Sequence, residues 1–251
     1  MQTETRSRAG DIVAQVHDQL RDAILLSEIR PGITTSQAEL ARDLGVGRTP
    51  LREAVRMLQD EGLVLAEPNR RVQVASLSVR DAEELYLMRI ALEAAAARIT
   101  VPQLTRGDIA ELEGLMAQMS HLATADSVAL FRPAHRAFHE RFVAGAGTRP
   151  AALIAELFDH AERYRAVYGA ASRHHLARRA GEHRAMLDAA ASGHADAVVD
   201  AIAVHYVNTA RLVAVALDPE HPLERLRTTV ATTAPGAISA FDERDGDPAS
   251  G

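Results

Sequence analysis

The sequence predicts a mainly α-helical protein, with a winged helix-turn-helix and a small β-hairpin wing followed by an all-α antiparallel six-helix bundle. Three observations support this fold class. Two short helical patterns lie either side of Gly45, two strand-like runs follow them, and helical periodicity then recurs from 79 to 217. Short loops between consecutive helices are typical of antiparallel neighbours in a bundle. We therefore expect two domains of different construction.

The first helix of the pair is marked by a capping box. The Ser36 side chain can accept from the backbone N–H of Glu39, and the Glu39 carboxylate can reach back to the cap. Apolar residues then keep helical spacing until Gly45, which tolerates the left-handed backbone that ends a helix. The pattern predicts a short helix that stops at this glycine.

The second helix is predicted to be capped by Thr49, with Pro50 in its first turn. Arg48, Arg52 and Arg56 recur at spacings of four, which places three cations on one flank with Thr49 at its tip. The planar arginine fork matches guanine or phosphate, so this helix suits the DNA major groove. The alternative is an ordinary helical hairpin with a solvated basic flank. The apolar stripe expected to be buried is Leu51, Ala54, Val55 and Leu58.

A hairpin is predicted directly after these helices. An apolar run at 61–65 and an alternating run at 72–74 flank a polar turn that carries Arg70 and Arg71. The tip of such a hairpin can reach the DNA backbone or minor groove. Its position favours a winged helix-turn-helix over a plain helical hairpin.

Composition limits the classes of protein to consider. The 251 residues include no cysteine, which excludes disulfides and thiolate chemistry, and we see no apolar run near the ~20 residues of a membrane helix. We expect a cytoplasmic protein with no membrane partner. All 28 basic side chains are arginine, yet the net charge is -6. DNA binding must therefore come from a local patch, and a homodimer on a palindromic operator would add two patches.

The chain divides into four predicted segments. Residues 1–10 are expected to form a disordered arm, and 11–76 the DNA-binding domain, beginning with an amphipathic helix from 11 to 27. Residues 77–217 are expected to form an all-helical ligand-binding and dimerisation domain. The low apolar periodicity of 218–251 predicts a disordered tail.

Four histidines are predicted on inward helix faces. His135 and His139 lie four apart on one apolar face, while His183 and His205 share the apolar stripes of two later helices. Any one of them could be a satisfied core histidine. Four together favour a metal, because one ion satisfies several imidazole nitrogens. The remaining histidines are expected on the surface or in loops: His17, His121, His160, His174, His175, His194 and His221.

The N-terminal third resembles the winged-helix domain of GntR-superfamily transcriptional regulators. The resemblance is carried by 30–32, 38–54, Leu58 and 61–64. It implies that Arg48, Thr49 and Arg52 contact operator DNA and that Arg70 and Arg71 serve the wing. Gly47 departs from the family, which usually has serine or threonine there. Arg71 stands where a glycine is common.

The region 79–217 resembles the FadR C-terminal ligand-binding domain, in its VanR-like six-helix form. The matching stretches are 89–93, 135–139, 182–186 and the terminal-helix His205. The resemblance implies a divalent metal held by His139, His183 and His205, which helps to bind the carboxylate of a small effector. His135 replaces the aspartate of the family. It is either a fourth ligand, or the site has lost its metal and binds effector directly.

The type of metal and the role of Arg89 follow from these residues. An all-nitrogen site favours Zn, with Ni or Cu next and Mn as a further candidate. Arg89 could bind the effector carboxylate or form an ion pair with Glu93. Taken together, we expect a homodimeric regulator, a repressor, and not an enzyme. The alternatives are a metalloenzyme, a regulator with a metal-free pocket, or an adaptor with a degenerate site.

Overall fold

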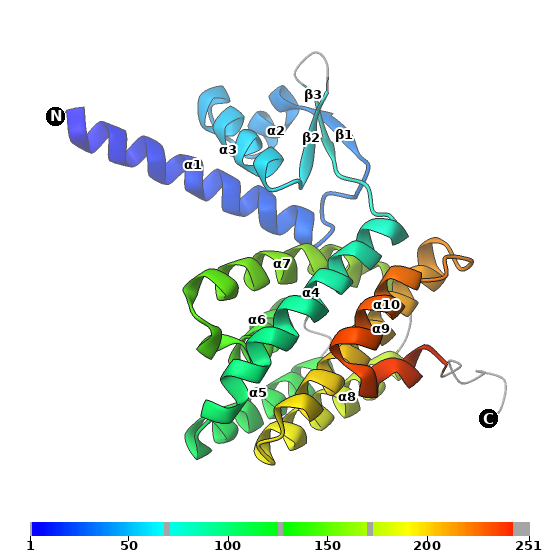
Figure 1. The fold of residues 1–251 in the computed structure, drawn as a ribbon. Helices are drawn as coiled ribbons and strands as arrows, with labels where there is room; N and C mark the ends of the chain where they lie inside the picture. Colours follow the sequence, from blue (N-terminus) through cyan, green and yellow to red (C-terminus); the bar gives the residue numbers. More distant parts are fainter. Residues whose placement is uncertain (1, 68–70, 125–127, 170–172, 243–251) are drawn as a thin grey trace. The chain divides into compact units, whose positions relative to one another are not determined.

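The computed structural model describes residues 2–67, 71–124, 128–169 and 173–242 of the chain. These form two compact units, Met1–Ser78 and Val79–Gly251, each with its own fold (Figure 1). The first is a winged helix-turn-helix with a small sheet and the second is helical, so the predicted fold class is confirmed.

Among its described residues, the first unit contains a three-stranded antiparallel sheet and three helices. Strand order is β1-β3-β2, and the core forms between this sheet and the helices. The elements are α1 (Gln2–Leu25), β1 (Thr34–Ser36), α2 (Gln37–Asp43), α3 (Arg48–Asp60), β2 (Val64–Glu67) and β3 (Arg71–Val74).

The helix-turn-helix follows the local signals in the sequence. Ser36 and Glu39 form the capping box of α2, and Gly45 has a φ of 65° in the turn. The predicted apolar stripe of α3 is buried. Thr49, however, is not the cap. Helix α3 begins at Arg48 after Gly47, which has extended backbone and makes no side-chain cap bond, so the Thr49 cap prediction is wrong.

Two further predictions for this unit are corrected by the structure, and one strand was missed. Helix α1 begins at Gln2, so the segment 1–10 expected as a disordered arm is helical from that residue. Strand β1 was not predicted, because its three residues become a strand only by pairing with β3. His17, expected on the surface, is 7% exposed and its Nε2 lies 2.5 Å from Glu61 at the end of α3.

The second unit contains the predicted bundle. Helices α4 to α9 are six in number and lie within the expected helical region 79–217, and α4 packs on α9 and α7 while α8 packs on α9. Their bounds are α4 (Val79–Thr100), α5 (Arg106–Thr124), α6 (Val128–Arg141), α7 (Thr148–Gly169), α8 (Arg173–Ala191) and α9 (Ala195–Leu217).

Helix α9 is the central helix of the bundle. Among the described helices it alone is long and apolar enough to cross a membrane by length and composition. Its apolar window is nevertheless 61% buried inside the unit. This is the pattern of a core helix, which packs its apolar faces against neighbouring helices.

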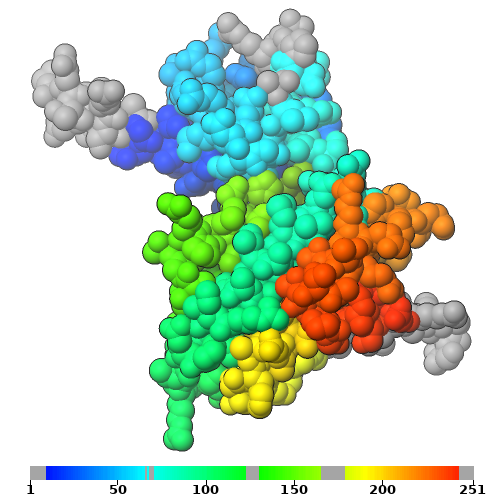
Figure 2. Space-filling view, viewed as in Figure 1, coloured from blue at the N-terminus to red at the C-terminus, as the bar shows by residue number. Residues whose placement is uncertain are grey.

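The predicted disordered tail is wrong for residues 218–242. Helix α10 (Glu224–Thr233) and the 3₁₀ segment η4 (Pro235–Phe241) pack against α4 and α9. Figure 2 shows this orange-to-red segment lying against the green-cyan surface of α4. Three alanines spaced by three suit the three-residue turn of a 3₁₀ helix. The buried residues are Leu223, Leu226, Val230, Ala234, Ala237 and Ala240, while 243–251 lie outside the described residues.

Glu83 of α4 holds the start of α10. Its Oε1 accepts hydrogen bonds from the backbone N–H groups of Arg225 (2.8 Å) and Leu226 (3.1 Å), and its Oε2 lies 2.8 Å from His221 Nε2. Helix α10 has no side-chain cap of its own, so a carboxylate from another helix satisfies its free N–H groups. Burial opposes ionisation of Glu83, but these hydrogen bonds outweigh it and lower its pKa.

Glu83→Gln is expected to destabilise the helical unit by about 1–2 kcal/mol at pH 7, because charge-assisted hydrogen bonds become neutral ones. The lowered pKa of Glu83 determines the direction in which its stabilising effect changes with pH. The stabilisation is fully present above the unfolded pKa of about 4.3 and is lost as pH falls through the lower folded value. Chemical denaturation of both proteins between pH 7 and pH 3 should show the difference shrinking towards acid. Glu113→Gln, which removes an exposed carboxylate of α5 in the same unit, is the control and should change stability by less than about 1 kcal/mol.

Candidate metal centre

Four histidines from three helices meet in the core of the second unit. His135 and His139 come from α6, His183 from α8 and His205 from α9, and each is at most 3% exposed. One ring nitrogen from each lies within 4.8 Å of the others. The structure therefore brings together all four histidines that the sequence predicted on inward faces.

The spacing of the ring nitrogens suits a tetrahedral ion. His139 Nε2 lies 3.1 Å from His135 Nε2 and 3.3 Å from His183 Nε2. With Zn–N bonds of about 2.0–2.1 Å, the ligand atoms of a tetrahedral site are about 3.3–3.4 Å apart. His135 Nε2 lies at this spacing from His139 Nε2, and all four ring nitrogens lie within 4.8 Å of one another, so the geometry fits a fourth nitrogen ligand.

Glu182 determines which nitrogen of His205 carries the proton. Its Oε2 lies 2.6 Å from His205 Nδ1, and its Oε1 accepts from Asn208 Nδ2 at 2.8 Å. An ionised carboxylate can only accept hydrogen bonds, so Nδ1 of His205 must be the donor. When this imidazole is neutral, its Nε2 carries a lone pair, which is the form that binds a metal.

Tyr206 determines the tautomer of His139 by the same reasoning. Its hydroxyl donates to Glu93 Oε2 at 2.7 Å and lies 3.3 Å from His139 Nδ1. Burial raises the pKa of Tyr206 well above its ordinary value, so the phenol keeps its single proton. Since that proton goes to Glu93, His139 Nδ1 is the donor, and in the neutral imidazole its Nε2 then carries a lone pair.

These tautomers indicate that the four histidines can bind a cation. The Nε2 lone pairs of His139 and His205 belong to a buried group of imidazoles walled by Phe138 and Phe158. Lone pairs that converge in a buried site need a proton or a cation between them. The donor set is all nitrogen, which suits Zn and the later divalent transition metals.

Arg89 forms the ion pair that was one of its two predicted roles. It is 4% exposed, its Nε lies 2.8 Å from Glu93 Oε1, and its Nη2 donates to the Tyr206 hydroxyl. Its guanidinium also lies over the rings of Tyr206 and Phe158. The described contacts therefore link Arg89 to His139 through the Tyr206 hydroxyl.

Sequence reasoning did not identify Glu182, Glu93, Asn208 or Tyr206 as part of this site. Glu182 precedes one clustered histidine and Tyr206 follows another, but adjacent positions on a helix point in different directions. Only the packing of α8 and α4 against α9 turns them towards the histidines. Asn208 Oδ1 is buried without a hydrogen-bond partner among the described residues, so it can accept from a bound molecule.

The predicted DNA-contacting side chains lie on the first unit. Arg48, Thr49 and Arg52 are exposed along α3, and the Arg52 side chain is 67% exposed with Nη2 3.5 Å from Glu53 Oε1. Arg71 is exposed at the start of β3, opposite Glu67 in the hairpin register. Arg70 lies outside the described residues. Figure 1 shows α3 and the hairpin within the same small unit.

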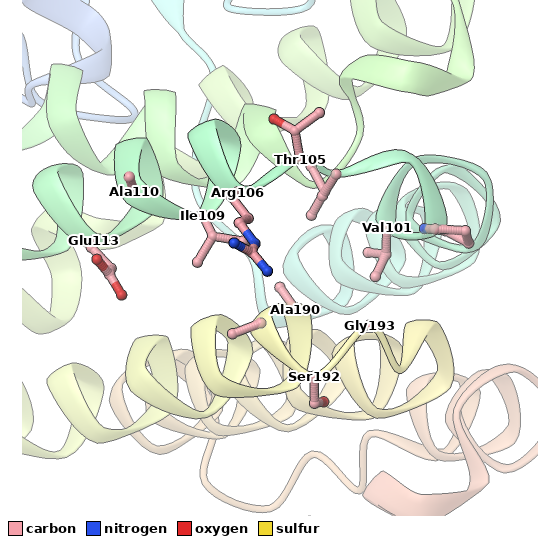
Figure 3. A pocket seen from close by; sticks show the side chains of 12 residues that line it. Val101, Thr105, Arg106, Ile109, Ala110, Glu113, Ala190, Ser192 and Gly193 are labelled. Atoms are coloured by element: carbon pink, nitrogen blue, oxygen red, sulfur yellow. The ribbon is translucent and has the colours of Figure 1, made fainter.

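A separate cavity of about 610 Å³ lies between the start of α5 and the end of α8. Arg106 points into it towards Ala190 (Figure 3). Its charged lining residues, Arg106 and Glu113, are exposed, and it contains none of the four histidines. The cavity is therefore unrelated to the histidine cluster.

Comparisons with known proteins match each unit to a known family. The profile of the gntR family of bacterial regulatory proteins matches residues 12–74, and that of the FCD domain matches residues 84–208. The chain is 43% identical over 91 residues to an HTH-type transcriptional regulator of Agrobacterium vitis, and 30% identical over 132 residues to the regulator YdhC of Bacillus subtilis. These alignments cover 36% and 51% of this chain. The chain spans 53% and 58% of the length of those relatives.

Solved structures agree on the fold. McbR of Escherichia coli matches with a TM-score of 0.70 at 20% identity, covering 80% of this chain and 96% of that chain. A GntR regulator from Rhodococcus sp. RHA1 matches with a TM-score of 0.69 at 23% identity, covering 81% and 98%. The two profiles and the shared fold lead to one conclusion: the chain belongs to the gntR family of bacterial regulatory proteins and carries a C-terminal FCD domain.

Proposed function

We propose that the protein is a DNA-binding transcriptional repressor controlled by a small carboxylate effector. The winged helix reads double-stranded operator DNA, and the FCD domain binds the effector beside a divalent metal held by His135, His139, His183 and His205. The observation that supports this best is the group of four buried imidazoles, on the same chain as a winged helix. We further propose that it acts as a cytoplasmic homodimer.

The DNA-binding part of the proposal rests on a local basic flank. Arg48, Arg52 and Arg56 are exposed at successive turns of α3, although the whole chain has a net charge of -6. A globally acidic protein binds DNA only where cations are concentrated, and two copies on a symmetric operator double such a patch.

The metal-binding part rests on the donor set. Zn is the first candidate, with Ni, Cu and Mn next, because imidazole suits these ions. When bound, such an ion would supply a positive Lewis-acid centre, and it could take an effector carboxylate oxygen as a fifth ligand beside the four imidazoles. The protein's own contribution is to fix the imidazole tautomers and exclude water. Asn208 Oδ1, a buried acceptor, favours an effector that carries a hydrogen-bond donor.

A metal-dependent enzyme is disfavoured by the same contacts. A general base would need a carboxylate that can reach a bound water. Among the described residues, Glu182 holds His205 and Asn208, and Glu93 holds Arg89 and Tyr206. These carboxylates support the histidines, and the chain's family is one of transcriptional regulators.

The proposal predicts that effector changes operator affinity. An operator selected from genomic fragments should be titrated with Zn-loaded protein, with and without acetate, malate and citrate as probes of mono-, di- and tricarboxylates. We expect at least one acid to change affinity by about 5–150-fold, which corresponds to a coupling free energy of about 1–3 kcal/mol. Native mass spectrometry of the purified protein would weigh the dimer, its metal and any acid bound with it. Identical titrations across the panel, with no acid found by mass, would contradict the effector role.

A further inference from the structure

A divalent ion held by four neutral imidazoles would bring its whole charge into a buried site. None of the four histidine ligands carries a negative charge to balance it, and burying an unbalanced charge is costly. Anionic groups close to the ligands would lower that cost. Two carboxylates among the described residues, Glu182 and Glu93, are linked by hydrogen bonds to the clustered histidines.

The two carboxylates differ in how they reach the cluster. Glu93 reaches His139 through the Tyr206 hydroxyl, and its charge is paired with Arg89 at 2.8 Å. Glu182 contacts His205 directly, with 2.6 Å between Oε2 and Nδ1, and its side chain is 9% exposed. Of these two, the Glu182 carboxylate is therefore better placed to act on the ion.

Glu182 is also held in one orientation. Its second oxygen accepts from Asn208 Nδ2, and Asn208 lies on α9 one turn beyond His205. Both carboxylate oxygens thus bind the same helix, while Glu182 itself precedes His183 on α8. The Glu182 side chain therefore connects His205 of α9 to the segment of α8 that carries His183.

We propose that Glu182 is a positioning residue for the metal, acting through His205. It keeps the His205 proton on Nδ1, so that Nε2 faces the ion, and it supplies negative charge that the four ligands lack. Carboxylates that orient metal-bound histidines in this way typically contribute 10–100-fold to metal affinity. The inference rests on the proposed metal site, and it names the residue outside the ligands that makes an all-imidazole set suitable for a divalent ion.

The test compares Zn²⁺ affinity of the full-length protein and its Glu182→Gln variant, by competition with a chelator of known affinity. Glutamine keeps the shape and one acceptor oxygen but removes the charge. We expect the variant to bind Zn²⁺ about 10–100-fold more weakly. Glu220→Gln removes an exposed carboxylate of the same unit and should leave the affinity unchanged.

The outcomes separate the two proposals. If the wild-type protein binds no Zn²⁺, the metal site itself is rejected and this inference with it. If the wild type binds Zn²⁺ and Glu182→Gln binds equally well, only the role of Glu182 is rejected. Circular dichroism of the metal-free proteins checks that the variant keeps its helical content.

A second measurement does not depend on metal. Nitrogen NMR of the metal-free protein reports which ring nitrogen of His205 carries the proton. We expect protonation at Nδ1 in the wild type and in Glu182→Gln, since the glutamine oxygen still accepts, and a mixture of tautomers in Glu182→Ala. A proton on Nε2 of His205 in the wild type would overturn the proposal.

Discussion

His139→Ala is expected to weaken Zn²⁺ binding by about 70- to 900-fold, because a binding free energy of about 10–16 kcal/mol is shared among four ligands. His139 is the ligand with the largest expected effect. Its Nε2 lies within 3.3 Å of the Nε2 atoms of both His135 and His183, and Tyr206 holds its other nitrogen. Chelator competition measures the loss.

The same variant should leave operator DNA binding largely intact, because His139 belongs to the second unit and α3 to the first. His194→Ala is the matched control, since His194 is an exposed histidine at the start of α9. Zn²⁺ binding by His139→Ala at wild-type affinity would contradict the metal site. A variant that loses its helical fold without metal would instead point to a structural role for the cluster.

Arg52→Ala is expected to reduce specific operator binding by about 30-fold or more. An arginine bound to a base edge contributes about 1–3 kcal/mol, and a homodimer loses this contact in both half-sites. Arg52 is the exposed cation one turn inside α3, where a recognition helix meets base edges. Arg48→Ala, at the first residue of α3, is expected to have a comparable effect.

Fluorescence anisotropy with operator and scrambled DNA, repeated at several salt concentrations, separates base contacts from phosphate contacts. Loss of a base contact removes the preference for operator DNA. Loss of a phosphate contact weakens binding to both DNAs and reduces the dependence of affinity on salt concentration. Arg80→Ala, an exposed arginine of the second unit, is the control. An Arg52→Ala variant that still prefers operator as strongly as the wild type would refute the assignment of α3 as the reading helix.

Both experiments probe features that the sequence already indicated. The capping box of α2, the glycine turn and the apolar stripe of α3 depend on residues within one or two helical turns. The four histidines were recognisable because each shares a helical face with apolar neighbours. Periodicity states which face of a helix is inward, so it selected the right residues without any knowledge of their distances.

Contacts between distant residues could not be predicted in this way. Strand β1 exists only because it pairs with β3, and α10 starts where Glu83 of α4, more than a hundred residues earlier, accepts its N–H groups. The tail looked disordered because its few apolar residues and alanines are weak local signals. They become buried once α4 and α9 provide a surface for them.

By itself, the sequence determined where most of the helices lie and the order of the two domains. It also determined that α3 has a basic flank and that four histidines lie on inward helix faces. These depend on local spacing along the chain. Tertiary structure alone decided that the imidazoles meet within 4.8 Å, that Glu182 and Tyr206 set the protons of His205 and His139, and that Arg89 pairs with Glu93. The physical reason is that a tautomer or an ion pair depends on distances of a few ångströms between side chains, and those distances are set by how helices pack on one another.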